Sequence, residues 1–165
     1  MVCSPRGSTS YDASQVSESD LVKLAIRLTP DSSGLMEHAW ADEETLWGRP
    51  LGNDLFEIRN IPWETDTLHF LDVVRCRIRS DDFWDVLELI RPSGHGTLRL
   101  TFADSASADQ REAVLTQLEQ LLGNIERMRD GHWAVDVNPS ADLDTMLAVL
   151  AQQEQAGVIV QSAHT

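Results

Sequence analysis

The sequence predicts an α+β protein, with an antiparallel sheet that has two C-terminal helices on one face, joined to a small curled β lobe. Three observations lead to this fold class. Short apolar stretches separated by turn residues fill the first half of the chain. Two apolar stripes at helical spacing follow. A β-branched run, Val158–Val160, closes the chain. Because helix stripes need a sheet to cover, we expect the two halves to share one core.

Strands dominate the first half. Residues 71–79 alternate between apolar and polar side chains, the pattern of a half-buried strand. Gly52 and Asn53 favour a hairpin turn between two short strands. Pro62 marks a corner because its ring excludes a central strand there. The predicted strands span residues 21–28, 45–49, 55–59, 71–79, 83–90 and 97–102.

The second half is predicted to contain both helices. Ser107 and Gln110 have capping-box spacing at the start of the first helix, and Gly123 is expected to end it. Ser140 is the expected cap of the second helix, and Gly157 is expected to end it. The apolar stripes consist of Val114, Leu115, Leu118, Leu121 and Leu122, and of Leu143, Met146, Leu147 and Leu150.

The length of 165 residues fits one domain. We expect a disordered tail over residues 1–18, a β-rich lobe over 19–103 and an α/β lobe over 104–165 that shares the same core. Cys3 and Cys76 form no disulfide framework, so a reduced, cytoplasmic location is the simplest expectation.

The charge is strongly acidic. Asp and Glu number 27 against 13 Lys and Arg, for a net charge of −14. Such a surface repels nucleic acids and anionic membranes, and attracts a basic protein partner. A simpler interpretation is that the charge only keeps the protein soluble. No phosphate-binding loop, dinucleotide motif or metal-ligand spacing is present, so the sequence predicts no cofactor and no metal.

The turn Ser93–Thr97 is the one place where nucleophile, base and cation crowd together. His95 is a candidate catalytic acid or base and Ser93 a candidate nucleophile or hydroxyl partner. Thr97 is a candidate hydrogen-bonding residue, and Arg91 and Arg99 are candidate holders of an anionic small molecule. The simpler interpretation is a strand connection whose polar groups satisfy the backbone.

A loop from Trp63 to Asp72 supplies two further candidate binding residues, at its two ends. Trp63 lies beside the proline corner and is the tryptophan we expect to line a pocket or partner surface. For most of the tryptophans, a role as core anchors is the simpler interpretation.

Several blocks of the sequence resemble one bacterial family, with the Ser-Gly-His turn as the most specific block. The blocks span residues 46–52, 56–63, 72–75, 91–99 and 134–139. The family is number 4265 in the series of domains of unknown function, and the resemblance covers roughly residues 20–162. Residues 64–71 depart from its pattern, being more acidic and having Leu71 in place of a glycine. The resemblance implies a bacterial, cytoplasmic protein and no particular activity.

Two functional hypotheses follow. In the first, the protein is a non-catalytic binding protein for a basic protein partner, in an immunity or antitoxin-like role. In the second, it is a small enzyme or ligand-binding domain whose site is the Ser93–Thr97 turn, acting on a small anionic metabolite.

Overall fold

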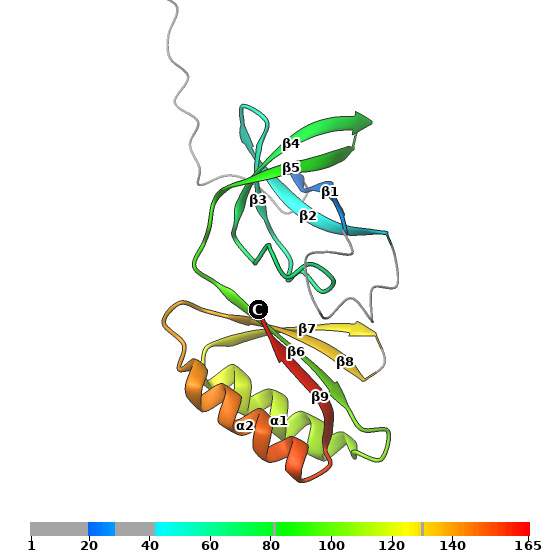
Figure 1. The fold of residues 1–165 in the computed structure, drawn as a ribbon, viewed down its shortest axis with the longest axis vertical. Helices are drawn as coiled ribbons and strands as arrows, with labels where there is room; N and C mark the ends of the chain where they lie inside the picture. Colours follow the sequence, from blue (N-terminus) through cyan, green and yellow to red (C-terminus); the bar gives the residue numbers. More distant parts are fainter. Residues whose placement is uncertain (1–19, 29–41, 81, 130) are drawn as a thin grey trace, which may run out of the picture.

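Two sheets, each with its own hydrophobic cluster, make up the computed structural model, which describes residues 20–28, 42–80, 82–129 and 131–165 (Figure 1). The α+β class predicted from the sequence is confirmed, and the curled lobe is a closed five-stranded barrel. The predicted tail, residues 1–18, lies outside the described residues.

The barrel contains the first five strands in chain order. They are β1 (Val22–Arg27), β2 (Glu43–Gly52), β3 (Leu55–Ile58), β4 (Val73–Ser80) and β5 (Phe83–Arg91). Parallel pairing of β1 with β5, in which Leu24 lies opposite Trp84, closes the barrel. Asn53 (φ 53°) and Asp54 (φ 60°) form the turn between β2 and β3, and Gly52 (φ 88°) is the last residue of β2. Leu24, Leu46, Ile58 and Val74 lie in its core.

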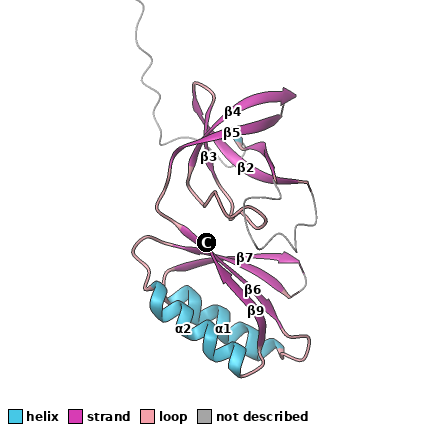
Figure 2. Ribbon diagram, viewed as in Figure 1, coloured by secondary structure: helices cyan, strands magenta, loops and turns pink. Residues whose placement is uncertain are grey.

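The second sheet has the order β7-β8-β6-β9, and all its pairings are antiparallel. Its elements are β6 (Gly96–Phe102), α1 (Ala108–Gln120), β7 (Gly123–Arg129), β8 (His132–Val137), α2 (Leu143–Gln155) and β9 (Ile159–His164). This βαββαβ order is the split βαβ arrangement of ferredoxin-like folds. Both helices lie on the face of this sheet that is turned away from the barrel (Figures 1 and 2).

β6 belongs to the second sheet, so the boundary between the sheets falls in the connection 92–95 rather than after residue 103. The two hydrophobic clusters have no residue in common. Hydrogen bonds of the connection and of the loop 59–72, together with the packing of Trp63 on His132, join the lobes instead. The expectation that the two halves share one core stays a prediction.

The helix ends differ in part from expectation. The capping box of Ser107 and Gln110 is confirmed. The prediction that Ser140 caps α2 was wrong, because the cap is Asp142, whose carboxylate accepts the Thr145 N–H. The prediction that Gly123 ends α1 was also wrong. Leu122 takes the left-handed turn (φ 68°) and Gly123 opens β7, where a Cβ would lie 2.7 Å from Val135 Cγ1.

A matched pair of serines tests this assignment of the caps. Ser107→Ala removes the acceptor of the Gln110 N–H, so we expect it to lower the free energy of unfolding by about 1 kcal/mol. Ser140→Ala removes no helix cap and is expected to change it by less than about 0.5 kcal/mol. Urea unfolding of both variants measures the difference, and equal losses would show that the caps are misassigned.

Candidate functional site

The Ser93–Thr97 turn connects β5 of the barrel to β6 of the second sheet. It contacts the loop 59–72 on one side and β8 on the other through its side chains. Gly94 has φ 83°, a left-handed conformation that glycine adopts without strain. The turn therefore brings residues from both lobes together.

His95 pairs with a carboxylate that the sequence analysis did not select. Its Nδ1 lies 2.7 Å from Asp136 Oδ1, and the two side chains are 9 % and 0 % exposed. Asn124 Nδ2 donates to the other carboxylate oxygen at 3.3 Å. The Phe70 ring packs edge-on against the imidazole, with 5.7 Å between centroids. A carboxylate on Nδ1 orients a histidine and leaves Nε2 to accept a proton, which is acid–base geometry.

Ser93 does not direct its hydroxyl at the imidazole. Its Oγ donates to the Phe70 carbonyl at 2.7 Å and accepts the His95 backbone N–H at 3.2 Å. Asp72, which is buried, accepts the backbone N–H groups of Ser93 at 2.7 Å and His69 at 2.8 Å. Both side chains thus hold the turn against the loop 59–72, a structural arrangement.

Arg99 fastens the loop 59–72 to the second sheet. Its guanidinium is largely buried and donates to the carbonyls of Trp63 and Thr65 and, at 3.0 Å, to Thr165 Oγ1. Trp63 also packs edge-on against His132, with 5.8 Å between ring centroids. Arg91 is exposed at the end of β5. The two arginines therefore do not converge on one anion.

Thr97 is fully buried in β6, opposite Asp136 of β8. Its hydroxyl hydrogen-bonds His69 Nδ1 at 3.1 Å. His69 is a second residue that sequence reasoning missed. Burial lowers its pKa below 6.5, an effect that the negative charge of Asp72 opposes. The structure thus places two histidines beside Asp72, Thr97 and Asp136.

The lowered pKa of His69 makes stability depend on pH. His69 binds a proton more tightly in the unfolded chain than in the folded protein. Its contribution to the free energy of unfolding is therefore present above pH 6.5, and it is lost as the pH falls through the lower pKa of the folded state. We expect His69→Gln, which keeps a polar partner for Thr97, to lose less stability than the wild type between neutral and mildly acidic pH. Urea unfolding across this range measures both, and parallel curves would contradict the assignment.

Glu44 is a third residue that the sequence did not reveal. Its carboxylate accepts three consecutive backbone N–H groups, those of Trp63 at 2.6 Å, Glu64 at 3.1 Å and Thr65 at 2.9 Å. Burial raises its pKa, and these hydrogen bonds oppose the rise. Glu44 and Arg99 therefore both bind the backbone of residues 63–65 in this loop.

Two surface hollows lie away from the turn. One is lined at the end of the barrel by Leu21, Lys23, Trp47, Ser80, Asp82 and Phe83. The other lies on α1. Among the described residues, no group of three or more His, Cys, Asp or Glu side chains is placed to hold a metal ion. None of the helices described is long and apolar enough to cross a membrane.

A closed barrel joined through a histidine-bearing turn to a split βαβ sheet defines a two-lobed α+β class of protein. Within this class the chain belongs to the DUF4265 family, a domain of unknown function whose model matches residues 44–160. The fold resembles that of a hypothetical protein from Neisseria gonorrhoeae, with 22% sequence identity, a TM-score of 0.66 and coverage of 87% of this chain and 92% of that one. No curated protein sequence matches significantly. The roles predicted for the turn residues remain predictions.

Proposed function

We propose that the protein is a non-catalytic binding protein for a basic protein partner, and that the layer formed by α1, α2 and their caps makes the contact. The observation that carries the proposal is the set of exposed carboxylates on this helix layer. They are Asp104, Asp109, Glu112, Glu119, Asp142, Asp144 and Glu154. In the described part of the chain none of them forms an ion pair with a basic side chain.

Arg111 is the basic residue of the helix layer, and it points back at the protein. Its Nε and Nη2 donate to the carbonyls of Ala106 at 3.1 Å and Ala103 at 3.0 Å, and its guanidinium lies over the Phe102 ring. It therefore leaves the outward charge of the layer largely unbalanced. Such a field accelerates association with a basic protein and selects against acidic ones.

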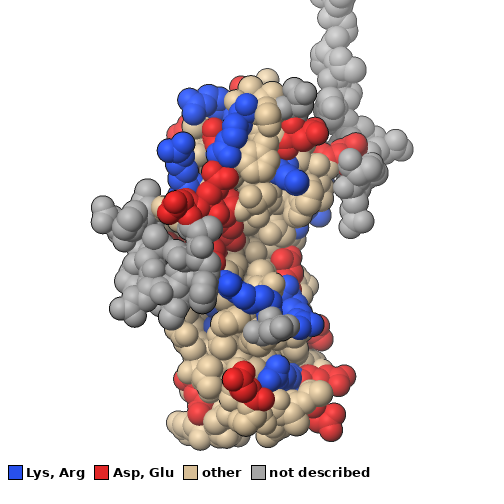
Figure 3. Space-filling view, turned by 90° about the vertical axis from the view of Figure 1, so that its right-hand side faces the viewer, with Lys and Arg blue, Asp and Glu red and all other residues tan. Residues whose placement is uncertain are grey.

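The barrel distributes its charge differently. Arg79 bridges Glu43 and Asp85, and Arg75 pairs with Glu88 at 2.8 Å. In Figure 3 acidic and basic side chains alternate over the barrel, whereas acidic ones surround one basic side chain at the helix end. Ion pairs therefore neutralise part of the acidic charge on the barrel, whereas the acidic side chains of the helix layer have no such partners.

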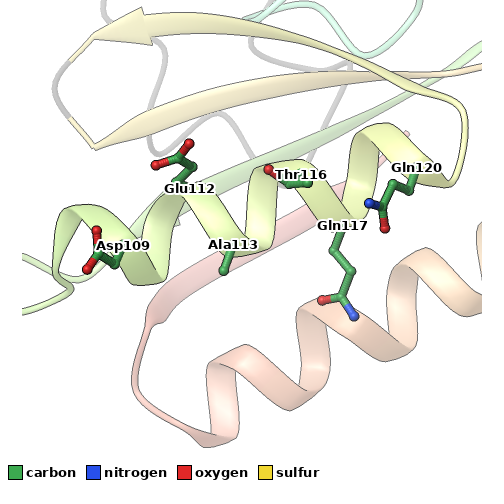
Figure 4. A pocket seen from close by; sticks show the side chains of 6 residues that line it. All are labelled: Asp109, Glu112, Ala113, Thr116, Gln117 and Gln120. Atoms are coloured by element: carbon green, nitrogen blue, oxygen red, sulfur yellow. The ribbon is translucent and has the colours of Figure 1, made fainter.

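The hollow on α1 gives the helix layer a shape that a partner protein can recognise. Its lining residues are exposed and lie along one face of the helix (Figure 4). They are Asp109, Glu112, Ala113, Thr116, Gln117 and Gln120. Carboxylates at one end and amides at the other can accept and donate hydrogen bonds to an arginine or lysine side chain and the backbone around it. An immunity or antitoxin-like role is the concrete form of this proposal.

Capture of partners from a lysate of the source organism tests the proposal. We expect a basic protein to be retained at low salt and released at high salt. The triple variant Asp109→Asn, Glu112→Gln, Glu119→Gln should lose most of the captured protein. A control variant neutralises three exposed barrel carboxylates, Asp42, Asp54 and Asp82, and should retain it.

Two outcomes would overturn the proposal. One is the recovery of no basic protein at low salt by the wild type. The other is equal loss in the helix-layer variant and the barrel variant, because the net charge would then matter rather than its position.

The second candidate function is a small enzyme or ligand-binding domain, which the pairing of His95 with Asp136 favours. If His95 binds an anionic metabolite, adding that metabolite should raise the melting temperature of the wild type. It should leave the melting temperature of His95→Gln unchanged. His132→Gln is the matched control, because it replaces a histidine that is hydrogen-bonded to Thr101. A shift that is the same in His95→Gln would exclude this site.

A further inference from the structure

The outer edge of β5 is open in the barrel. β5 pairs with β4 along its length, but it pairs with β1 only from Phe83 to Asp85. Along Val86–Arg91, the other edge therefore has no strand partner among the residues that the structure describes. The N–H and C=O groups of an open edge are a template for another strand.

Apolar side chains line this edge. Leu87 is 53 % exposed, Leu89 41 % and Ile90 40 %. On the neighbouring strand, Ile78 of β4 is 55 % exposed. Natural proteins usually protect an open edge with charged side chains or proline. Between Val86 and Ile90 there is no lysine or proline, and Glu88 is the one charged residue. An exposed apolar group of this kind marks an interaction surface.

The charges around the edge favour a second copy of the chain as the occupant. The carboxylate of Asp85 accepts from Arg79 Nε at 2.8 Å, and that of Glu88 lies 2.8 Å from Arg75 Nη1. Arg91 adds a positive charge at the end of the strand. Two copies that meet here avoid the repulsion that their helix layers would cause.

We propose that β5 pairs antiparallel with β5 of a second copy, about a two-fold axis at Glu88, to form a homodimer. A two-fold axis at Glu88 sets Leu87 opposite Leu89 and Val86 opposite Ile90 of the other copy, and the pairing ends before Asp85, where β1 occupies the edge. Over Val86–Ile90 this register matches apolar side chains with apolar ones. The two Glu88 side chains meet at the axis, where each is balanced by its own Arg75.

Sedimentation over a concentration series tests the dimer with the full chain. We expect a monomer–dimer equilibrium that strengthens with salt, because screening reduces the repulsion between two copies of net charge −14. Binding of a basic partner should weaken with salt, so the two associations are distinguishable. Leu87→Asp should raise the dissociation constant at least about tenfold. Val160→Asp, at a site in β9 that is 64 % exposed, should leave it unchanged.

Cross-linking tests the register. In a Cys3→Ser background, Glu88→Cys should form a disulfide-linked dimer on mild oxidation, because directly opposed residues of antiparallel strands have a Cα separation that a disulfide spans. Val160→Cys should remain monomeric. Three results would each overturn the proposal: a monomer at all concentrations, a dimer unaffected by Leu87→Asp, or a dimer that forms only when residues 1–19 are deleted. The last would show that the chain's own N-terminal segment occupies the edge.

Discussion

Replacing Arg99 with methionine is expected to lower the free energy of unfolding by about 3–5 kcal/mol, the range for removing one partner from a buried charged network. The change deletes the donors to the Trp63 and Thr65 carbonyls and leaves the buried carboxylate of Glu44 without its nearby positive charge. Methionine keeps much of the apolar volume of the arginine side chain. The loss in free energy of unfolding therefore measures the interactions of the guanidinium group. Urea unfolding monitored by tryptophan fluorescence measures it.

Arg75→Met is the matched control for this measurement. Arg75 and its partner Glu88 are both about half exposed, so their ion pair should contribute about 0–1 kcal/mol. If Arg99→Met cost no more than Arg75→Met, the loop 59–72 would not depend on Arg99, and the described junction between the lobes would be wrong.

Leu118→Ala is expected to cost about 2–5 kcal/mol, the range for a buried leucine. Leu118 is 0 % exposed in α1 and packs in the cluster of the second sheet. Truncation removes apolar contacts and leaves a cavity that its neighbours fill only in part. Thermal and urea unfolding measure the loss.

Two comparisons show whether burial causes this loss. Leu122→Ala removes the same atoms at a site 54 % exposed, and should cost far less. Deletion of residues 1–18 should shift the melting temperature by less than about two degrees, because surface changes contribute little. A deletion that destabilises more than Leu118→Ala would contradict the predicted disordered tail.

Local patterns predicted most of the fold. The alternation over residues 71–79 and the spacing of Ser107 and Gln110 depend on neighbours within a few positions, and both correspond to observed elements. The closure of the barrel could not be predicted from the sequence, because the pairing of Leu24 with Trp84 joins strands that are far apart along the chain. Gly123 was misread for a similar reason, since its close approach to Val135 is a tertiary contact.

The candidate site was predictable only in part. The turn residues could be selected because they are adjacent in sequence. The partner of His95 could not, since 41 positions separate it from Asp136. A signal was nevertheless present, because Asp136 interrupts an apolar strand, and such a buried carboxylate needs a partner. Arg99 donates to the protein's own carbonyls because the loop 59–72 packs against it. The spacing of apolar residues in the sequence does not predict that packing.

Zero-length carbodiimide cross-linking of the protein to its captured basic partner tests whether the helix layer makes the contact, because this chemistry joins carboxylates to lysines in contact. We expect cross-links on the helix layer, at Asp109, Glu112, Glu119 and Asp144. Cross-links confined to barrel carboxylates such as Asp54 and Asp82, with the helix layer unmodified, would contradict it.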